Sequence, residues 1–289
     1  MSTKERRSSV SGMLEVLGVS RSGYYVWRKR QPSLSQKRRE HIKKKIRVIY
    51  HASKENYGAP KITRELRKEG EVIAERTVGS YMRQEGIRAQ WVKPWIATTK
   101  NSDFSSQLQN LLEEQYNPER PNAVWCTDIT YVWTDEGFVY LTSIMDLFSR
   151  KIIAWNVTDN LDVSCVVDTV EKAKVRRNPS LPLILHSDRG SQYISQEYRR
   201  VTADIELSYS AKASPWENAC IESFHSLIKR EWLNRFKIKH FTHAYHLIFE
   251  YIETFYNTVR IHSYCDYLSP NDFEKMQKQT EKKNYQLVS

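Results

Sequence analysis

Apolar residues between positions 124 and 208 fall into short runs with the length and composition of β-strands. The first two runs, residues 124–133 and 138–145, are rich in β-branched and aromatic residues, and the polar residues 134–137 between them form a hairpin turn. A third run at 151–158 completes an antiparallel meander. Two shorter runs, 183–186 and 205–208, follow segments with helical spacing. This order predicts an α/β domain built on a mixed five-stranded sheet.

A long helix is expected after the fifth run. Ser214, Pro215 and Glu217 supply an N-cap, a first-turn proline and a capping-box glutamate, so the helix should begin near Pro215. Glu222 and Lys229 lie seven residues apart and therefore share one face of it. The buried stripe beside them consists of Ile221, Phe224, Leu227, Ile228 and Trp232.

The C-terminal part is expected to be helical as well. Residues 242–257 form an amphipathic pattern, and a polar loop with Arg260, His262 and Ser263 follows. The charged tail from Glu274 is expected to fray.

The N-terminal third shows only helical patterns. Two small helices are predicted within residues 11–30 and three within 35–89, where glycines mark the turns. Lys and Arg on the second group are consistent with a helix-turn-helix arrangement that enters a DNA groove. The alternative is a helical packing module without base contacts. In either case the phosphate contacts are expected from Lys43, Lys44, Lys61, Arg64 and Arg76.

These patterns divide the chain into five segments. They are an N-terminal helical segment (1–34), a helix-turn-helix-like module (35–89), a linker (90–117), an α/β core (118–236) and a C-terminal helical extension (237–289).

Charge separates the module from the core. Residues 1–100 hold 24 Lys and Arg against 9 Asp and Glu, whereas the remaining residues hold 21 against 25. This suggests that one part holds a polyanion on which the other part acts, although the charge could serve solubility alone. No apolar run is long enough to cross a bilayer, and the first residues lack a signal-peptide core, so we expect a soluble, cytoplasmic protein. The four cysteines are not spaced for a zinc site or a disulfide framework.

Three carboxylates are the candidate metal-binding residues. Asp128 lies within the first strand, Asp188 follows the apolar run that ends at His186, and Glu222 lies on the long helix. An unpaired charge in an apolar strand is costly unless a cation or a donor compensates it, and three converging carboxylates suit hard divalent ions. Taken alone, Asp128 could instead be a structural residue bonded to backbone.

Short sequence motifs surround these three residues, and further motifs occur along the chain. They are Thr127-Asp128-Ile129-Thr130, residues 186–193, and Glu222-Ser223-Phe224 with a basic residue two turns later. With Tyr57-Gly58, Tyr256-Asn257, Arg260 and Ser269-Pro270, they resemble the DDE transposases of bacterial insertion sequences, in the catalytic reading frame with a retroviral-integrase core. The resemblance covers nearly the whole chain. The chain departs from the family's pattern at one spacing: 33 residues separate Asp188 and Glu222, two fewer than is common in the family.

The resemblance implies a ribonuclease H-like catalytic core in residues 118–236. It implies that Asp128 bridges two Mg²⁺ or Mn²⁺ ions about 3.5 to 4 Å apart, that Asp188 holds one and that Glu222 holds the other. Water would then cut a phosphodiester at a transposon end, and the freed 3′-hydroxyl would attack target DNA. Lys229 would contact DNA beside the metals; the alternative is a solvated helix-face lysine.

The resemblance also implies partners. These are transposon-end and target DNA, other copies of the chain in a homo-oligomer on paired ends and, in part of the family, an upstream-frame protein, all at the bacterial nucleoid. Two other readings stay open. One is a metal-dependent nuclease of the same fold without strand transfer, and the other is a DNA-binding regulator or an inactive domesticated relic.

Overall fold

The computed structural model describes residues 10–90, 110–112, 117–179, 182–210 and 218–288. Its centre is a five-stranded sheet of β1 (Val124–Thr134), β2 (Gly137–Asp146), β3 (Lys151–Thr158), β4 (Ile184–Ser187) and β5 (Glu206–Tyr209), in the order β3-β2-β1-β4-β5. The first three strands are antiparallel, and β4 and β5 run parallel to β1. The predicted mixed sheet is therefore confirmed, with strand ends shifted by no more than one residue.

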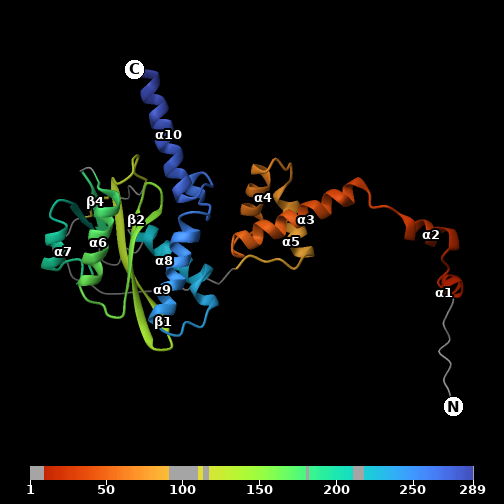
Figure 1. Ribbon diagram of the computed structural model, residues 1–289, viewed down its shortest axis with the longest axis horizontal. Coiled ribbons are helices and arrows are strands. Elements are labelled where there is room, and N and C mark those ends of the chain that lie inside the picture. The colour runs from red at the N-terminus through yellow and green to blue at the C-terminus, as the bar shows by residue number, and fades with distance from the viewer. Residues whose placement is uncertain (1–9, 91–109, 113–116, 180–181, 211–217, 289) are drawn as a thin grey trace, which may run out of the picture.

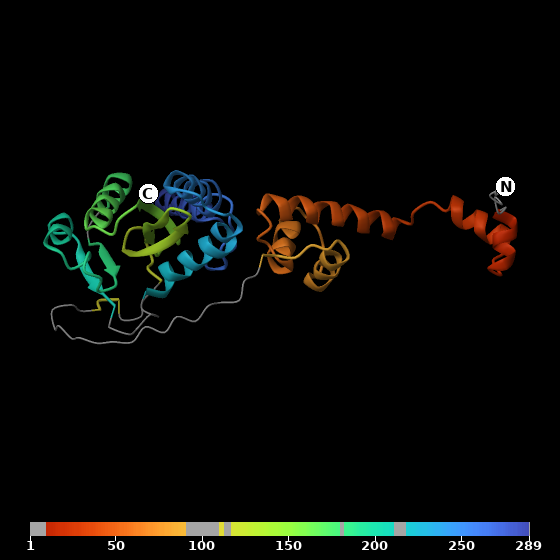
Figure 2. The ribbon, with the colours of Figure 1, turned by 90° about the horizontal axis from the view of Figure 1, so that it is seen from below.

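Helices cover both faces of the sheet (Figures 1 and 2). On one face, Trp125, Ile144 and Ile153 pack with α6 (Ser164–Arg177) and α7 (Gln196–Val201). On the other, Cys126, Leu141 and Ile152 pack with α8 (Ala219–Glu231), α9 (Phe241–Phe249) and the π-helical turn η3 (Glu250–Tyr256). Since successive strand residues point to opposite faces, the even-numbered positions of β1 from 124 to 128 face α8.

Two predicted helices are present, one with its start outside the described residues and one with a change of helix type. The described part of α8 begins at Ala219, and the predicted start at Ser214, Pro215 and Glu217 lies outside the described residues. The predicted helix at 242–257 is present, but its second half is π-helical.

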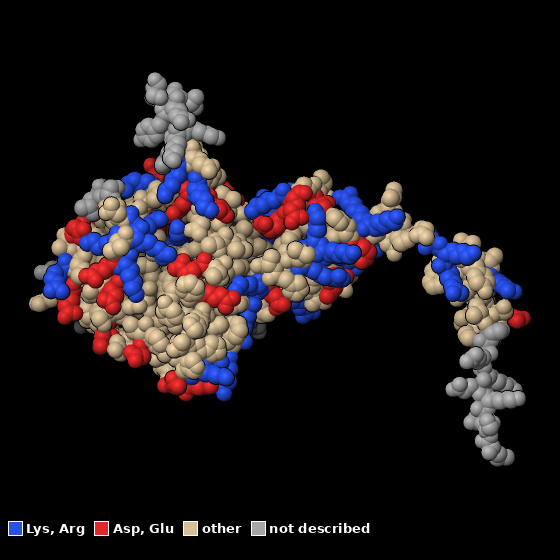
Figure 3. Space-filling view, viewed as in Figure 1, with Lys and Arg blue, Asp and Glu red and all other residues tan. Residues whose placement is uncertain are grey.

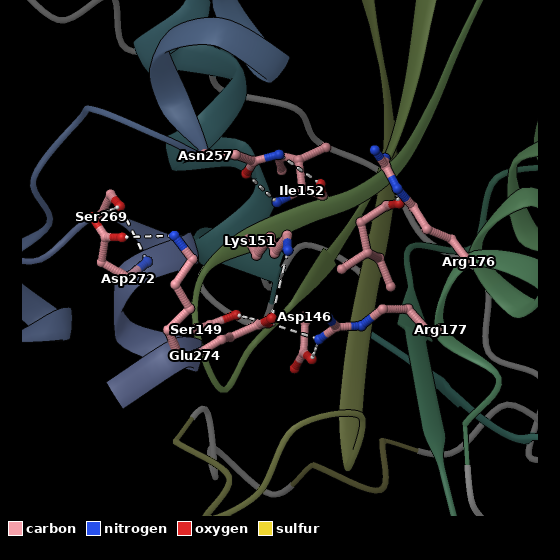
Figure 4. A network of polar contacts seen from close by, with 12 residues as sticks. Asp146, Ser149, Lys151, Ile152, Arg176, Arg177, Asn257, Ser269, Asp272 and Glu274 are labelled. Atoms are coloured by element: carbon pink, nitrogen blue, oxygen red, sulfur yellow. Dashed lines mark hydrogen bonds and ion pairs between the residues drawn. The ribbon is translucent and has the colours of Figure 1, made fainter. Parts of the chain in front are cut away.

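The prediction that the tail frays from Glu274 is wrong, because α10 runs from Pro270 to Val288. Glu274 is buried, accepts a hydrogen bond from Ser149 at 2.7 Å and forms an ion pair with Arg177 at 2.7 Å (Figure 4). Arg177 also pairs with Asp146, which caps the turn after β2 by accepting from the Phe148 N–H. These long-range partners hold the first turns of α10 on the core.

The N-terminal part contains α1 (Val10–Val16), α2 (Arg21–Lys29), α3 (Leu34–Ala52), α4 (Ala59–Lys68) and α5 (Glu75–Gln84). The last three pack around Ile46, Ile62 and Leu66, which are fully buried. Basic side chains gather over α2 to α5, with acidic ones among them (Figure 3).

The three-helix module is joined to the core by residues near the C-terminus. Ile261 is buried within the hydrophobic cluster of the module, and its backbone N–H donates to the Tyr57 hydroxyl at 2.8 Å. The Arg235 side chain, from the short turn η2 (Leu233–Arg235), donates to the Lys54 carbonyl at 2.6 Å. The loop after η3 therefore completes the interior of a module that begins more than two hundred residues earlier.

Candidate active site

Strand register brings Asp128 and Asp188 together. β1 and β4 are parallel neighbours in which Cys126 lies opposite His186. Asp128 and Asp188 each follow two residues later, so the same register places them side by side where β4 ends at Ser187. The Gly190 N–H donates to one Asp188 oxygen at 2.9 Å and fixes the carboxylate in the turn after the strand. This is the strand-end position at which α/β folds commonly build sites.

Helix α8 brings the third carboxylate to the same place. Ile221, Phe224 and Ile228 anchor α8 on the face of β1 to which Asp128 points. His225 and Lys229 follow Glu222 by three and seven residues. The three side chains therefore form a row on the helix beside the buried one. His225 is buried, and its Nδ1 lies 3.2 Å from Asp128 Oδ2. The helix thus presents a carboxylate, an imidazole and an ammonium along the strand that carries Asp128.

The three carboxylates affect one another electrostatically. Loss of solvation raises the pKa of Asp188, and the negative charge of Asp128 raises it further. Desolvation likewise raises the pKa of Glu222, and the charges of Asp128 and Asp188 add to it. Among the described residues, the one ion pair at this cluster joins Asp128 to His225, and none joins Asp188 or Glu222 to a lysine or arginine. The cluster is therefore an accumulation of negative charge, with the Lys229 ammonium close enough to Asp128 for the two charges to attract each other.

The site is more open than the sequence suggests. The Asp128 side chain is 19% exposed, and Asp188 and Glu222 lie at the surface. No group of three His, Cys, Asp or Glu side chains in the described part of the chain is arranged to hold one metal ion by itself. The donor set still suits Mg²⁺ or Mn²⁺, because such ions take one or two protein carboxylates and complete their shell with water and phosphate oxygens. Mutual repulsion among the carboxylates is also what a divalent cation would relieve.

His225 was missed by the sequence interpretation. Its Nε2 lies 3.3 Å from the Ser143 hydroxyl, and Ser143 stands directly opposite Asp128 on β2. The chain Ser143–His225–Asp128 therefore fixes the Asp128 side chain. The spacing of three residues from Glu222 could have placed His225 on the correct helix face, but the strand register was needed to find its partners. Nearby, the Asn218 amide donates to the Thr127 carbonyl at 3.4 Å.

Three further residues named in the sequence analysis, Lys229, His186 and Arg260, lie in different environments. Lys229 is half-buried with its Nζ 4.5 Å from the centre of the Tyr131 ring. His186 does not reach the carboxylates through its ring, because its two ring nitrogens lie 2.8 and 3.0 Å from the hydroxyls of Ser208 and Ser210. Arg260 approaches α8 at the far end, where it pairs with Glu231 through two contacts of 2.7 Å.

The predicted phosphate-binding residues of the module all lie away from the carboxylates. Lys44 and Arg76 are exposed, and Arg64 is exposed with its guanidinium 4.5 Å from the Tyr267 ring centre. Lys43 is paired with Glu85 at 3.0 Å. Lys61 lies at the junction with the core, where burial and then the charge of Arg260 lower its pKa to about 8.

Comparison with known proteins adds family matches to this geometry. A model described as Integrase core domain matches residues 118–215, a second with the same description matches 203–270, and an HTH-like domain model matches 37–95. Together with the sheet order, they confirm the predicted ribonuclease H-like core and the helix-turn-helix-like module. Within the described residues, no helix has the length and hydrophobicity to cross a membrane.

Two relatives match over most of their length. Transposase InsF for insertion sequence IS3A of Escherichia coli (strain K12) is 36% identical over 272 residues, which cover 92% of this chain and 94% of that protein. Transposase for insertion sequence element IS904 of Lactococcus lactis subsp. lactis is 37% identical over 248 residues, covering 85% and 98%.

Similar solved structures have low sequence identity. The HTLV-2 integrase catalytic core domain in complex with magnesium is 16% identical at a TM-score of 0.39, and the match covers 52% of this chain and 94% of that one. The catalytic domain of Mos1 mariner transposase is 12% identical at a TM-score of 0.39, covering 45% and 70%.

Proposed function

The chain belongs to the IS3 family of insertion-sequence transposases, and on that premise we propose that Asp128, Asp188 and Glu222 form a metal-dependent DDE centre that cuts DNA and transfers the strand. The observation that carries the proposal is that three carboxylates, from two strands and a helix, lie close enough for their charges to raise the pKa of Asp188 and of Glu222, while no described lysine or arginine forms an ion pair with them. Divalent cations bound at these carboxylates would relieve their mutual repulsion.

Each residue then has a defined part. Asp128, whose charge acts on both of the others, would help Asp188 to hold one Mg²⁺ or Mn²⁺ ion and Glu222 to hold a second. Bound ions would supply positive charge at the attacking and leaving oxygens of a phosphodiester. His225 holds one Asp128 oxygen through Nδ1 and so orients the carboxylate. Lys229, seven residues after Glu222, would place its ammonium on a neighbouring phosphate.

The proposed reaction has two displacements at phosphorus. In the first, water attacks a phosphodiester at the transposon end, the P–O3′ bond breaks, and a 3′-hydroxyl is released. In the second, that hydroxyl attacks a target phosphodiester, so one P–O bond forms as another breaks. Energy from the broken bond is kept in the new one, and no covalent protein intermediate is needed. The centre would accordingly act as a polynucleotidyl transferase.

The basic module would hold the DNA. Residues 1–100 carry the whole positive excess of the chain, and the exposed Lys44, Arg64 and Arg76 are suited to phosphate contacts. We further propose that the chain acts as a homo-oligomer on paired transposon ends, with an upstream-frame protein as a further partner, in the bacterial cytoplasm at the nucleoid.

A titration with Mn²⁺ tests the metal-binding step. Calorimetry on the whole chain should show binding to the parent and its loss in Asp128→Asn. Asp135→Asn, at the exposed hairpin turn, is the matched control and should bind like the parent. If the parent binds no Mn²⁺ even with DNA present, the catalytic proposal fails and a DNA-binding relic is favoured.

A second assay separates the two enzymatic readings. With a pre-nicked transposon end and plasmid target, the parent should give joined products, and Glu222→Gln should give none. Metal-dependent cutting without joined products would instead identify a nuclease.

A further inference from the structure

The hairpin formed by β1 and β2 carries an unusual group of exposed aromatic side chains. Tyr131, Trp133 and Phe138 are 54%, 63% and 46% exposed, whereas the intervening Val132 is buried. Trp133 lies opposite Phe138 in the strand register, with ring centres 4.8 Å apart in an edge-to-face contact. Tyr131 makes a similar contact with Phe138 at 5.2 Å. Three contiguous exposed rings form a patch of the kind that marks a binding surface, unlike single exposed apolar residues.

This patch is one wall of a groove. Tyr131, Val132 and Trp133 face Lys229, Asn234 and Phe236 across it, so the opposite wall comes from the end of α8 and from the turn η2 with the residue after it. The groove follows the edge of β1 that β4 leaves uncovered, since β4 pairs with β1 only from Val124 to Cys126. We refer to it as the aromatic groove.

The aromatic groove lies beyond the carboxylate site along the same strand and helix. Tyr131 is three residues beyond Asp128, which corresponds to about 10 Å along a strand. Lys229 lies on the same row of α8 as Glu222 and His225, and its Nζ covers one face of the Tyr131 ring at 4.5 Å. A linear ligand whose reacting group lies at the carboxylates would therefore reach Lys229 and then Trp133.

The chemistry of the groove favours one class of ligand. Flat rings beside an ammonium are how proteins bind nucleic acid strands without reading sequence, because every base has a face that stacks and every linkage carries a negative charge. Lys237, 83% exposed and paired with Asp135 at 3.4 Å, adds a second cation beside the groove. An apolar helix would have to cover the half-buried Lys229 without neutralising it, which is costly.

We propose that the aromatic groove binds one or two unpaired nucleobases of the DNA strand that leads from the reacting phosphate, with Trp133 as the stacking platform and Lys229 on the backbone. The inference rests on the proposed function for the presence of DNA at the carboxylates. It adds that the duplex end is opened there, with its bases held on the hairpin.

The test uses the whole chain and 20-nucleotide probes of mixed sequence that contain 5-iodouracil, either single-stranded or as blunt duplex. Trp133→Ala should weaken binding of the single strand about 5- to 100-fold, and Trp133→Phe should restore most of it. Binding of the duplex through the basic module should change less than about twofold. Ultraviolet cross-links of the single strand should map by mass spectrometry to Trp133 or Tyr131.

Tyr245→Ala is the matched control. Tyr245 is 40% exposed on α9 and contacts Trp155 on β3, two strands away from β1. It should leave both affinities unchanged, and the thermal midpoint of each variant shows whether it has folded. Lys229→Met changes the groove at a second position and should also weaken binding of the single strand.

The outcomes separate the two proposals. If the parent binds neither probe, the proposed function itself fails. If the parent binds both, but Trp133→Ala and Lys229→Met bind the single strand equally well and cross-links map elsewhere, only the groove assignment is overturned. A change in oligomeric state with unchanged affinity would assign the groove to a second copy of the chain and would also overturn it.

Discussion

Helix α8 carries two glutamates, nine residues apart, whose surroundings are opposite. Glu222 in the first turn faces two other carboxylates, and its pKa is raised by desolvation and by their charge. Glu231 in the last turn is more deeply buried, yet its pKa is lowered, because Arg260 and the Tyr251 hydroxyl outweigh the effect of burial. The fold thus pairs the structural carboxylate directly with a cation, whereas no described lysine or arginine forms an ion pair with the carboxylates at which we propose that metal and DNA bind.

The largest effect is expected from removing the cation of the structural pair. Arg260→Ala leaves the buried Glu231 without its partner, and loss of one member of a buried ion pair costs about 3 to 5 kcal/mol. Thermal unfolding followed by circular dichroism should show a midpoint at least about 6 °C lower. A double variant, Arg260→Met with Glu231→Leu, should recover much of the loss, and failure to do so would contradict the assignment to charge.

A smaller effect is expected from releasing Asp128. His225→Gln removes the Nδ1 contact, and loss of a group that orients a ligand lowers metal affinity about 10- to 100-fold. Calorimetric titration with Mn²⁺ measures this independently of activity. His240→Gln, a change of the same kind at the N-cap of α9, should leave the affinity unchanged. Equal affinities in the parent and His225→Gln would show that Asp128 needs no such support.

Beside the Arg260–Glu231 pair lies a second cation, Lys61, which forms no ion pair with a carboxylate of the described residues. Its pKa of about 8 is below the usual 10.5, so between these values the unfolded chain binds more protons and stability rises with pH. Lys61→Met should therefore stabilise the protein below pH 8 by about 1 kcal/mol, or 2 to 4 °C, and the gain should disappear above pH 10.5. A gain that persists there would come from packing and not from charge.

The smallest effect is expected at Asp188, because solvent screens its charge. Its raised pKa means that the folded state holds the proton more tightly, so stability falls as pH rises through the range between the unfolded and folded values. Asp188→Asn should stabilise the metal-free protein at pH 7 by less than about 1 kcal/mol and have no effect near pH 3. Chemical denaturation at both pH values measures this, and destabilisation at pH 7 would contradict the contrast with Glu231.

Much of the fold could be predicted because its signals are local. The five strands are marked by β-branched runs and turns, and the helical module by periodic apolar residues with glycine breaks. The strings around Asp128, Asp188 and Glu222 also singled these residues out as the candidate site, and their role stays a prediction. The proximity of Asp128 and Asp188 needs only the parallel register of β1 and β4, whereas that of Glu222 depends on how α8 packs on β1.

The remainder depends on contacts between distant residues. Ser143 and His225 become partners of Asp128 only once β1 is paired with β2 and α8 lies across them. The tail at Glu274 looks like a mobile charged segment unless Arg177 and Ser149 are known to lie beside it. Exposure of Trp133 could not be expected either, since an aromatic residue in a strand pattern is normally assigned to the interior.

The position of Ile261 has a consequence for dissecting the protein by truncation. A fragment ending before it would leave the helical module with an open apolar hollow and the Tyr57 hydroxyl without its donor. A fragment lacking the module would expose Ile261 to water. Both fragments are therefore expected to be less stable than the whole chain, and the interior of the module is completed only when biosynthesis has reached the last quarter of the chain.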